Sequence, residues 1–220
     1  MKPFSFCGAD LVALPSGALL WPAQKLLTVS DLHLGKSERI ARRSGQMLPP
    51  YETIDTLTRL QTDLDAHTPE YVICLGDSFD DLQASTLMPE NITDWITRLM
   101  AGRSWTWIEG NHDPGPLNLG GSHRAQQQIV PLTFRHIAEP APASGEVSGH
   151  YHPKASLRTR GRSVTRPCFL YDQTRLILPA YGTYTGGLRT NAATLQSLMA
   201  QDARAILTGA SAVEIPMPRS

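Results

Sequence analysis

Four short segments of the sequence concentrate carboxylate, imidazole and amide side chains, which are groups that hold divalent metal ions in proteins. The segments are Asp31-Leu-His33, Gly76-Asp77-Ser-Phe-Asp80, Gly110-Asn111-His112-Asp113 and Gly149-His150-Tyr-His152. Each of them alone arises by chance in many proteins. Because all four occur in a fixed order, each at the end of an apolar run, the set indicates a centre for two metal ions.

The spacing inside these segments suits metal binding. Asp31 and His33 are two residues apart, as are His150 and His152. On an extended segment such residues point the same way, so each pair is expected to present two ligands to one cavity. Asp77 follows an apolar run and a glycine. Since a carboxylate has two oxygens, Asp77 is the candidate for a ligand that both ions share.

Asn111 offers a neutral oxygen, and this choice has an electrostatic consequence. Two divalent ions, two aspartates and one bridging hydroxide leave a net charge of about +1. An aspartate in place of Asn111 would make the centre neutral. The positive centre is therefore expected to attract phosphate anions and to stabilise charge on a phosphoryl group during transfer.

His112 adjoins Asn111 in the chain and is expected to face the substrate rather than the metal ions. Asp113 is the candidate to orient its imidazole, as carboxylates do at other histidine sites. These two residues are the predicted catalytic pair. The alternative for both is a structural turn, stabilised by an Asx-type hydrogen bond before Pro114.

The four segments supply too few nitrogen ligands for two ions, so a further histidine is expected. His136 ends the apolar run 129–134 and precedes His150 in the chain. His67 is far from any of the segments, and His123 lies in an irregular stretch. His136 is therefore the predicted ligand, although a lone histidine at the end of a strand is more often structural.

Two groups of charged residues have simpler readings. Asp80 and Asp81 are interpreted as helix N-caps that need no metal. Six arginines are candidates for binding a polyanionic substrate: Arg39, Arg42, Arg43, Arg158, Arg160 and Arg162. The last three alternate and could line one face of an extended segment. A solvated hairpin explains them equally well.

The apolar patterns predict the elements that position these residues. A hairpin is expected around Pro15-Ser16-Gly17, between the segments 11–14 and 18–21. The pattern then predicts strands at 25–30, 71–75 and 104–108, separated by helices at 52–66 and 89–100. This βαβαβ order indicates a parallel sheet, whose sites lie at the carboxyl ends of its strands. Further strands are expected at 129–135, 146–148, 164–171, 175–178, 203–207 and 212–215, with a helix at 191–200.

Length and composition set the remaining expectations. The 220 residues fit a single domain spanning 1–220. Twenty basic and twenty acidic side chains cancel, so the chain has no global field that would gather nucleic acid. Its three cysteines lie among apolar neighbours and are expected to be reduced, as in a cytoplasmic protein. No membrane-spanning or signal pattern is visible.

The ordered ligand set, over residues 25–190, resembles the calcineurin-like metallophosphoesterase superfamily. Several sequence segments resemble one bacterial subgroup, the DNA-ligase- and helicase-associated phosphodiesterases. These segments are Asp31-Leu-His-Leu-Gly-Lys36, Leu48-Pro-Pro-Tyr51, Arg166-Pro-Cys-Phe169, Leu178-Pro-Ala-Tyr-Gly182 and Thr185-Gly-Gly-Leu188.

The resemblance implies an α/β fold, a four-layer α/β/β/α sandwich of two mixed β-sheets flanked by helices. It implies two divalent ions, most commonly Mn²⁺, with Fe, Zn, Co or Ni as alternatives, and in-line attack by a metal-bridging hydroxide. By position, one ion would be held by Asp31, His33, Asp77 and His152, and the other by Asp77, Asn111, His136 and His150. His112 would be the substrate-facing acid or phosphate contact.

The function that the resemblance implies is a phosphodiesterase with DNA endonuclease activity in DNA repair. Its expected partners are DNA, in single-stranded form, and by association a DNA ligase and a helicase. A phosphomonoesterase acting on a nucleotide or phosphoprotein would use the same metals and remains an alternative. A non-catalytic scaffold of the same fold is a third reading, but such proteins usually lose ligands and this chain keeps them all.

Overall fold

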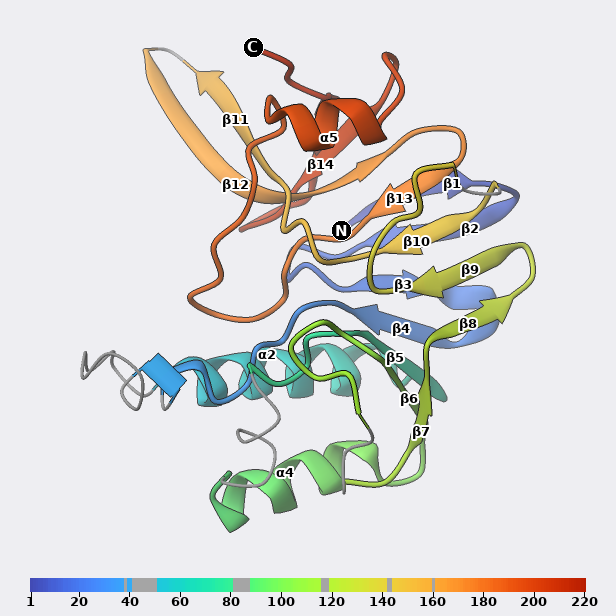
Figure 1. The fold of residues 1–220 in the computed structure, drawn as a ribbon, viewed down its shortest axis with the longest axis vertical. Coiled ribbons are helices and arrows are strands. Elements are labelled where there is room, and N and C mark those ends of the chain that lie inside the picture. Colours follow the sequence, from blue (N-terminus) through green and yellow to red (C-terminus); the bar gives the residue numbers. More distant parts are fainter. Residues whose placement is uncertain (38, 41–50, 81–87, 116–118, 142–143, 160) are drawn as a thin grey trace.

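The computed structural model describes residues 1–37, 39–40, 51–80, 88–115, 119–141, 144–159 and 161–220, without the side chains of 158, 159 and 162. Its first β-sheet has seven strands in chain order (Figure 1). They are β1 (Lys2–Phe6), β2 (Ala9–Ala13), β3 (Leu19–Trp21), β4 (Leu26–Val29), β5 (Tyr71–Leu75), β6 (Ser104–Ile108) and β7 (Ser122–Arg124). Strands β1 to β4 pair antiparallel, whereas β4 to β7 pair parallel, so the sheet is mixed.

The second sheet has eight strands and is also mixed. They are β8 (Gln126–Ile129), β9 (Leu132–Arg135), β10 (Glu146–Ser148), β11 (Lys154–Thr159), β12 (Arg162–Tyr171), β13 (Arg175–Ile177), β14 (Arg204–Leu207) and β15 (Val213–Pro216). The order is β15-β14-β12-β13-β10-β9-β8, with β11 paired to β12. Strand β10 is parallel to β9 and β13, and the other pairs are antiparallel.

In the part of the chain that the structure describes, helices cover the outer faces of the two sheets. Helices α2 (Glu52–His67) and α4 (Glu90–Met100) pack on the first sheet, and α5 (Ala193–Leu198) packs on the second (Figure 1). Side chains alternate along the strands, so Leu27 meets the helices while Leu26 meets the second sheet. The resulting four-layer α/β/β/α sandwich confirms the predicted fold class. No described helix is long and apolar enough to cross a membrane.

Most predicted elements lie where the sequence pattern placed them. Strands β5, β6 and β10 have the expected bounds, and β2 and β3 form the expected hairpin. The prediction of one continuous strand at 129–135 is wrong, because β8 and β9 form a hairpin that turns at Val130-Pro131. Proline has no backbone N–H and cannot continue a paired strand there. Strands β1 and β7 were not anticipated, since neither carries a strong apolar alternation.

Candidate metal centre

The predicted ligand segments meet because the loops after β4, β5 and β10 hydrogen bond to one another. The N–H of Asp31 donates to the carbonyl of Gly76 (3.2 Å), and that of His33 donates to the carbonyl of Asp77 (2.9 Å). The N–H of His150 donates to Asp31 Oδ2 (3.0 Å). The carboxyl ends of β4, β5 and β10 therefore build one site, as expected for a parallel arrangement.

A first cluster of potential ligands consists of Asp31, His33 and His152, whose ligand atoms lie within 4.8 Å of one another. Asp31 Oδ1 lies 3.1 Å from His152 Nε2. Asp31 Oδ1, His33 Nε2 and His152 Nε2 are buried and have no hydrogen-bond partner among the described residues. Buried polar atoms without partners are costly. One oxygen and two nitrogens that converge in this way fit a divalent metal ion.

A second cluster consists of Asp77, His136 and His150, whose ligand atoms also lie within 4.8 Å of one another. His136 Nε2 lies 3.3 Å from both Asp77 Oδ2 and His150 Nδ1. The amide oxygen of Asn111 is 3.0 Å from the same His136 nitrogen. The two clusters adjoin, since His136 Nδ1 is 3.9 Å from Asp31 Oδ1. The structure thus brings all seven predicted metal ligands into one site.

The electrostatic environment keeps the two aspartates ionised. Burial would raise the pKa of Asp77, but His136 and the N–H of His112 (2.8 Å from Oδ1) together lower this pKa to about 2. Burial opposes ionisation of Asp31 as well, yet His152 and His136 hold its pKa below the usual value. Burial lowers the pKa of His150, and the nearby His136 lowers it further. A lowered pKa favours neutral imidazole, the form that binds metals.

The backbone at the ligands lies in the left-handed region. Asp31, His33, Asp77, His150 and His152 have φ values of 54°, 47°, 46°, 69° and 45°. L-residues rarely adopt this region, and such strain gathers at functional sites. The expectation that the pairs Asp31/His33 and His150/His152 lie on extended backbone is therefore wrong. Asp31 and His33 reach the same cluster, whereas His150 and His152 divide between the two.

Comparisons with known proteins agree with this geometry. The family model of the calcineurin-like phosphoesterases matches residues 24–177. The chain belongs to this family. The crystal structure of Pseudomonas putida nuclease MPE superposes on this phosphoesterase with a TM-score of 0.78 at 28% sequence identity, covering 96% of this chain and 99% of that one.

A second solved structure, the phosphoesterase Yfce from E. coli, has a TM-score of 0.44 at 11% identity, covering 88% of this chain and 99% of that one. A search of curated proteins found no match. The family match confirms the resemblance that the four segments carry.

Asp80 has a role at the site of this phosphoesterase that the sequence pattern did not predict. It is fully buried, its Oδ1 lies 2.9 Å from His33 Nδ1, and its other oxygen binds Arg39 Nε. The expected N-cap role of Asp80 is thus replaced by a contact to a metal-ligand candidate, while Asp81 lies outside the described residues. A carboxylate on one ring nitrogen fixes the tautomer and leaves the other nitrogen free to bind. The sequence feature that could have revealed this role is the second carboxylate of the segment Gly76–Asp80.

His112 and Asp113 are both at the site, but they do not contact each other as expected. His112 Nδ1 lies 2.9 Å from the carbonyl oxygen of Asp80. Asp113 Oδ2 accepts the N–H groups of Ser78 (2.8 Å) and Phe79 (3.1 Å). The prediction that Asp113 orients His112 is therefore wrong, because the Asp113 carboxylate turns toward the loop that carries Asp77. Burial, with the nearby Asp77, raises the pKa of Asp113 to about 6.

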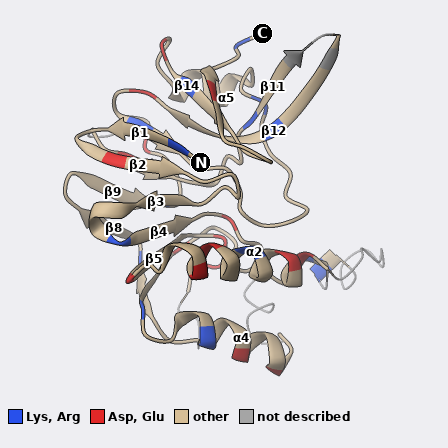
Figure 2. Cartoon of the chain, turned by 180° about the vertical axis from the view of Figure 1, so that it is seen from behind, with Lys and Arg blue, Asp and Glu red and all other residues tan. Residues whose placement is uncertain are grey.

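The predicted substrate arginines are only partly described. Arg39 engages Asp80, while Arg42, Arg43 and Arg160 lie outside the described residues. Strands β11 and β12, which carry Arg158 and Arg162, form an antiparallel ribbon that projects from the second sheet (Figure 1). The hairpin reading of the backbone is confirmed, and the arginines' contact with substrate stays a prediction. Basic and acidic residues are interspersed over the chain (Figure 2), in keeping with its zero net charge.

Proposed function

We propose that this phosphoesterase is a metal-dependent phosphodiesterase that cleaves DNA as an endonuclease. The observation that carries the proposal is the pair of adjoining ligand clusters, in a chain that matches a nuclease over nearly its whole length. Two such clusters suit phosphoryl transfer, where most of the catalysis is positioning and charge stabilisation.

The donor set fits two divalent ions, and we propose Mn²⁺, with Fe, Zn, Co or Ni as alternatives. Asp31, His33 and His152 would hold one ion, and Asn111, His136 and His150 the other, with Asp77 shared between them. Mixed oxygen and nitrogen ligands suit these metals. When bound, the ions supply an activated water and positive charge beside the phosphoryl oxygens.

His112 would contact the phosphoryl group or the leaving oxygen. A carbonyl oxygen can only accept, so the Asp80 carbonyl places a proton on His112 Nδ1 and fixes the ring. The opposite nitrogen, Nε2, is then the atom available to the substrate. Protonated, it would donate to a phosphoryl oxygen or to the departing alkoxide.

A circular single-stranded DNA tests the activity, since only an endonuclease can open a circle. After metal removal and reloading with Mn²⁺, the protein should linearise the circle and hydrolyse methyl p-nitrophenyl phosphate, a diester. Hydrolysis of p-nitrophenyl phosphate alone would indicate a phosphomonoesterase instead. Absence of all three activities in the metal-loaded protein would favour a non-catalytic scaffold.

We further propose a DNA repair context, in which the protein acts on single-stranded DNA alongside a DNA ligase and a helicase. The protein should cleave the single-stranded form of a DNA sequence faster than the duplex form of the same sequence. Co-purification of the tagged protein with a ligase or helicase from its own cells tests the association. Equal cleavage of both DNA forms, with neither partner recovered, would contradict this context.

A further inference from the structure

The loop between β13 and α5 lies against the first ligand cluster and is fixed to it at both ends. The N–H of Gly182 donates to the carbonyl of Asp31 (3.0 Å), and a Cβ at Gly182 would collide with the backbone of Leu32. At the other end, a Cβ at Gly187 would collide with the carbonyl oxygen of His152. Residues 183–186 are therefore held beside the metal-ligand candidates.

Tyr184 stands at the tip of this loop in a strained conformation. Its φ is 60°, in the left-handed region, and it is 47% exposed. Both neighbours are pinned: the N–H of Thr183 donates to Thr56 Oγ1 (3.0 Å), and the carbonyl of Thr185 accepts from Lys154 Nζ (3.1 Å). Among the described residues, the Tyr184 ring makes no hydrogen bond and no ring contact. The chain thus holds an aromatic ring in solvent at a position that favours glycine.

Basic side chains line two cavities near the loop. A cavity of about 440 Å³ is lined by Thr185 together with Arg59 and Arg166. A second cavity, of about 570 Å³, is lined by Lys154 and Arg189. Neither Arg166 nor Arg189 forms an ion pair with any residue that the structure describes. Their charges are available to phosphates of a strand that passes the loop.

We propose that Tyr184 is a stacking platform for a nucleobase next to the scissile phosphate. The inference rests on the proposed nuclease function and names the part of the substrate that the loop binds. Proteins hold single-stranded nucleic acid with solvent-exposed aromatic rings that have basic side chains nearby, because every base has a face that can stack. The strain at Tyr184 is then the cost of presenting the ring beside the metal centre.

The test is a double-mutant cycle between Tyr184 and the DNA. Oligonucleotides that carry one abasic residue at successive positions around the cleavage site are cleaved by the wild type and by Tyr184→Leu. The substitution should raise KM on the intact oligonucleotide about 5- to 150-fold. At one abasic position this effect should vanish. The fluorescence of a 2-aminopurine base at that position should be quenched when the oligonucleotide binds the wild type, and should not be quenched when it binds Tyr184→Leu.

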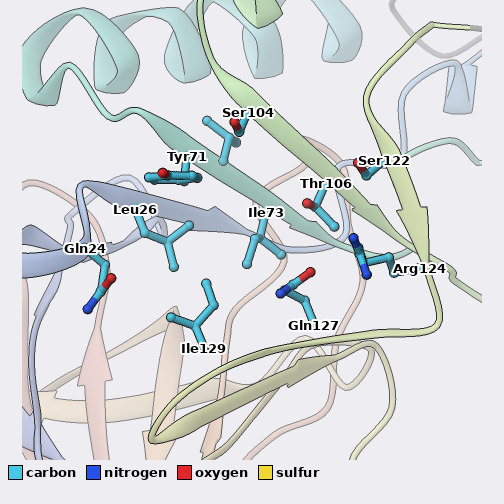
Figure 3. Close-up of a pocket in the computed structure, with 11 residues that line it drawn as sticks. Gln24, Leu26, Tyr71, Ile73, Ser104, Thr106, Ser122, Arg124, Gln127 and Ile129 are labelled. Carbon is cyan, nitrogen blue, oxygen red and sulfur yellow. The ribbon is translucent and has the colours of Figure 1, made fainter.

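Two variants separate stacking from folding. Tyr184→Gly relieves the backbone strain, so it should fold at least as well as the wild type yet show the same rise in KM. Tyr71→Leu is the matched control, because Tyr71 is 48% exposed but lines a cavity at the amino end of β5, opposite the centre (Figure 3). It should leave KM unchanged. Equal effects of Tyr184→Leu on intact and all abasic substrates would overturn the base platform alone, whereas absence of DNA cleavage by the wild type would overturn the nuclease function as well.

Discussion

The imidazole of His136 packs directly on Gly76, so that a Cβ added to Gly76 would lie 2.6 Å from the ring. The same ring is fixed by a 2.8 Å hydrogen bond between its Nδ1 and the carbonyl of Leu75. Gly76 also has a φ of 73°, which favours glycine. The glycine before Asp77 therefore sets where the nitrogen of His136 can stand in the second cluster.

Gly76→Ala should displace His136 and weaken the second metal site while leaving the first intact. Metal analysis after reloading should give about one ion per chain instead of about two. Gly102→Ala is the control, because Gly102 has a φ of 76° but no atom within 4 Å of its added Cβ. If the Gly76 variant keeps both ions, His136 is not a ligand that depends on this packing.

His112→Ala should keep its metals and lose activity. The imidazole of His112 contacts the backbone of Asp80, and only its backbone N–H donates to Asp77 Oδ1, a contact that alanine keeps, so loss of the ring leaves the donor set in place. The loss of a positioned acid or charge stabiliser lowers turnover by roughly 10²- to 10⁴-fold. Turnover of methyl p-nitrophenyl phosphate and metal content measured on the same sample check the split. A parallel fall in both would make His112 a metal ligand.

Asp80→Asn should weaken metal binding at the first cluster, because it removes the negative charge that orients His33. Carboxylate partners of metal-binding histidines typically contribute about 10- to 100-fold to metal affinity or activity. Titration of the metal-free protein with Mn²⁺ measures the change. Asp10→Asn, at an exposed position on β2, is the control. An unchanged affinity would leave Asp80 with a structural role only.

The β11–β12 ribbon is the place to test the predicted polyanion binding. Replacing Arg158, Arg160 and Arg162 together with alanine should raise KM for single-stranded DNA and flatten its salt dependence. The log–log slope should fall by about 0.7 for each phosphate that the variant no longer neutralises. Turnover of methyl p-nitrophenyl phosphate should stay unchanged, since a small diester reaches only the metal centre. Equal losses on both substrates would favour the structural hairpin.

The residues alone predict which side chains meet at the site, whereas their division between two ions was expected only from the family resemblance. Parallel strands with buried apolar runs, such as β5 and β6, were recognisable from their residues alone, and residues that follow such strands share one edge of the sheet. The separation of His150 from His152 follows from left-handed backbone, which pattern rules for extended segments do not anticipate. It depends on contacts between distant loops, including the hydrogen bond from Gly149 to His136.

Asp80 shows a second limit of sequence reasoning. Local rules favour an N-cap for an aspartate after a loop, and only the fold reveals that His33, 47 residues earlier, is its partner. Asp113 lies against the loop that carries Asp77, but its acceptor role toward Ser78 and Phe79 could not be predicted from its neighbour His112. Contacts of this kind are set by tertiary packing rather than by local propensity.

The proposed two-ion site depends on one carboxylate, Asp77, that both metal ions would share. Metal content and diester turnover of Asp77→Ala, measured together after reloading with Mn²⁺, test this sharing. We expect less than about one ion per chain and a loss of turnover of at least about 10³-fold, since the shared counter-charge is gone. The unfolding temperature of the metal-free variant serves as the control for folding. About two ions per chain with near-normal turnover would contradict the shared role of Asp77.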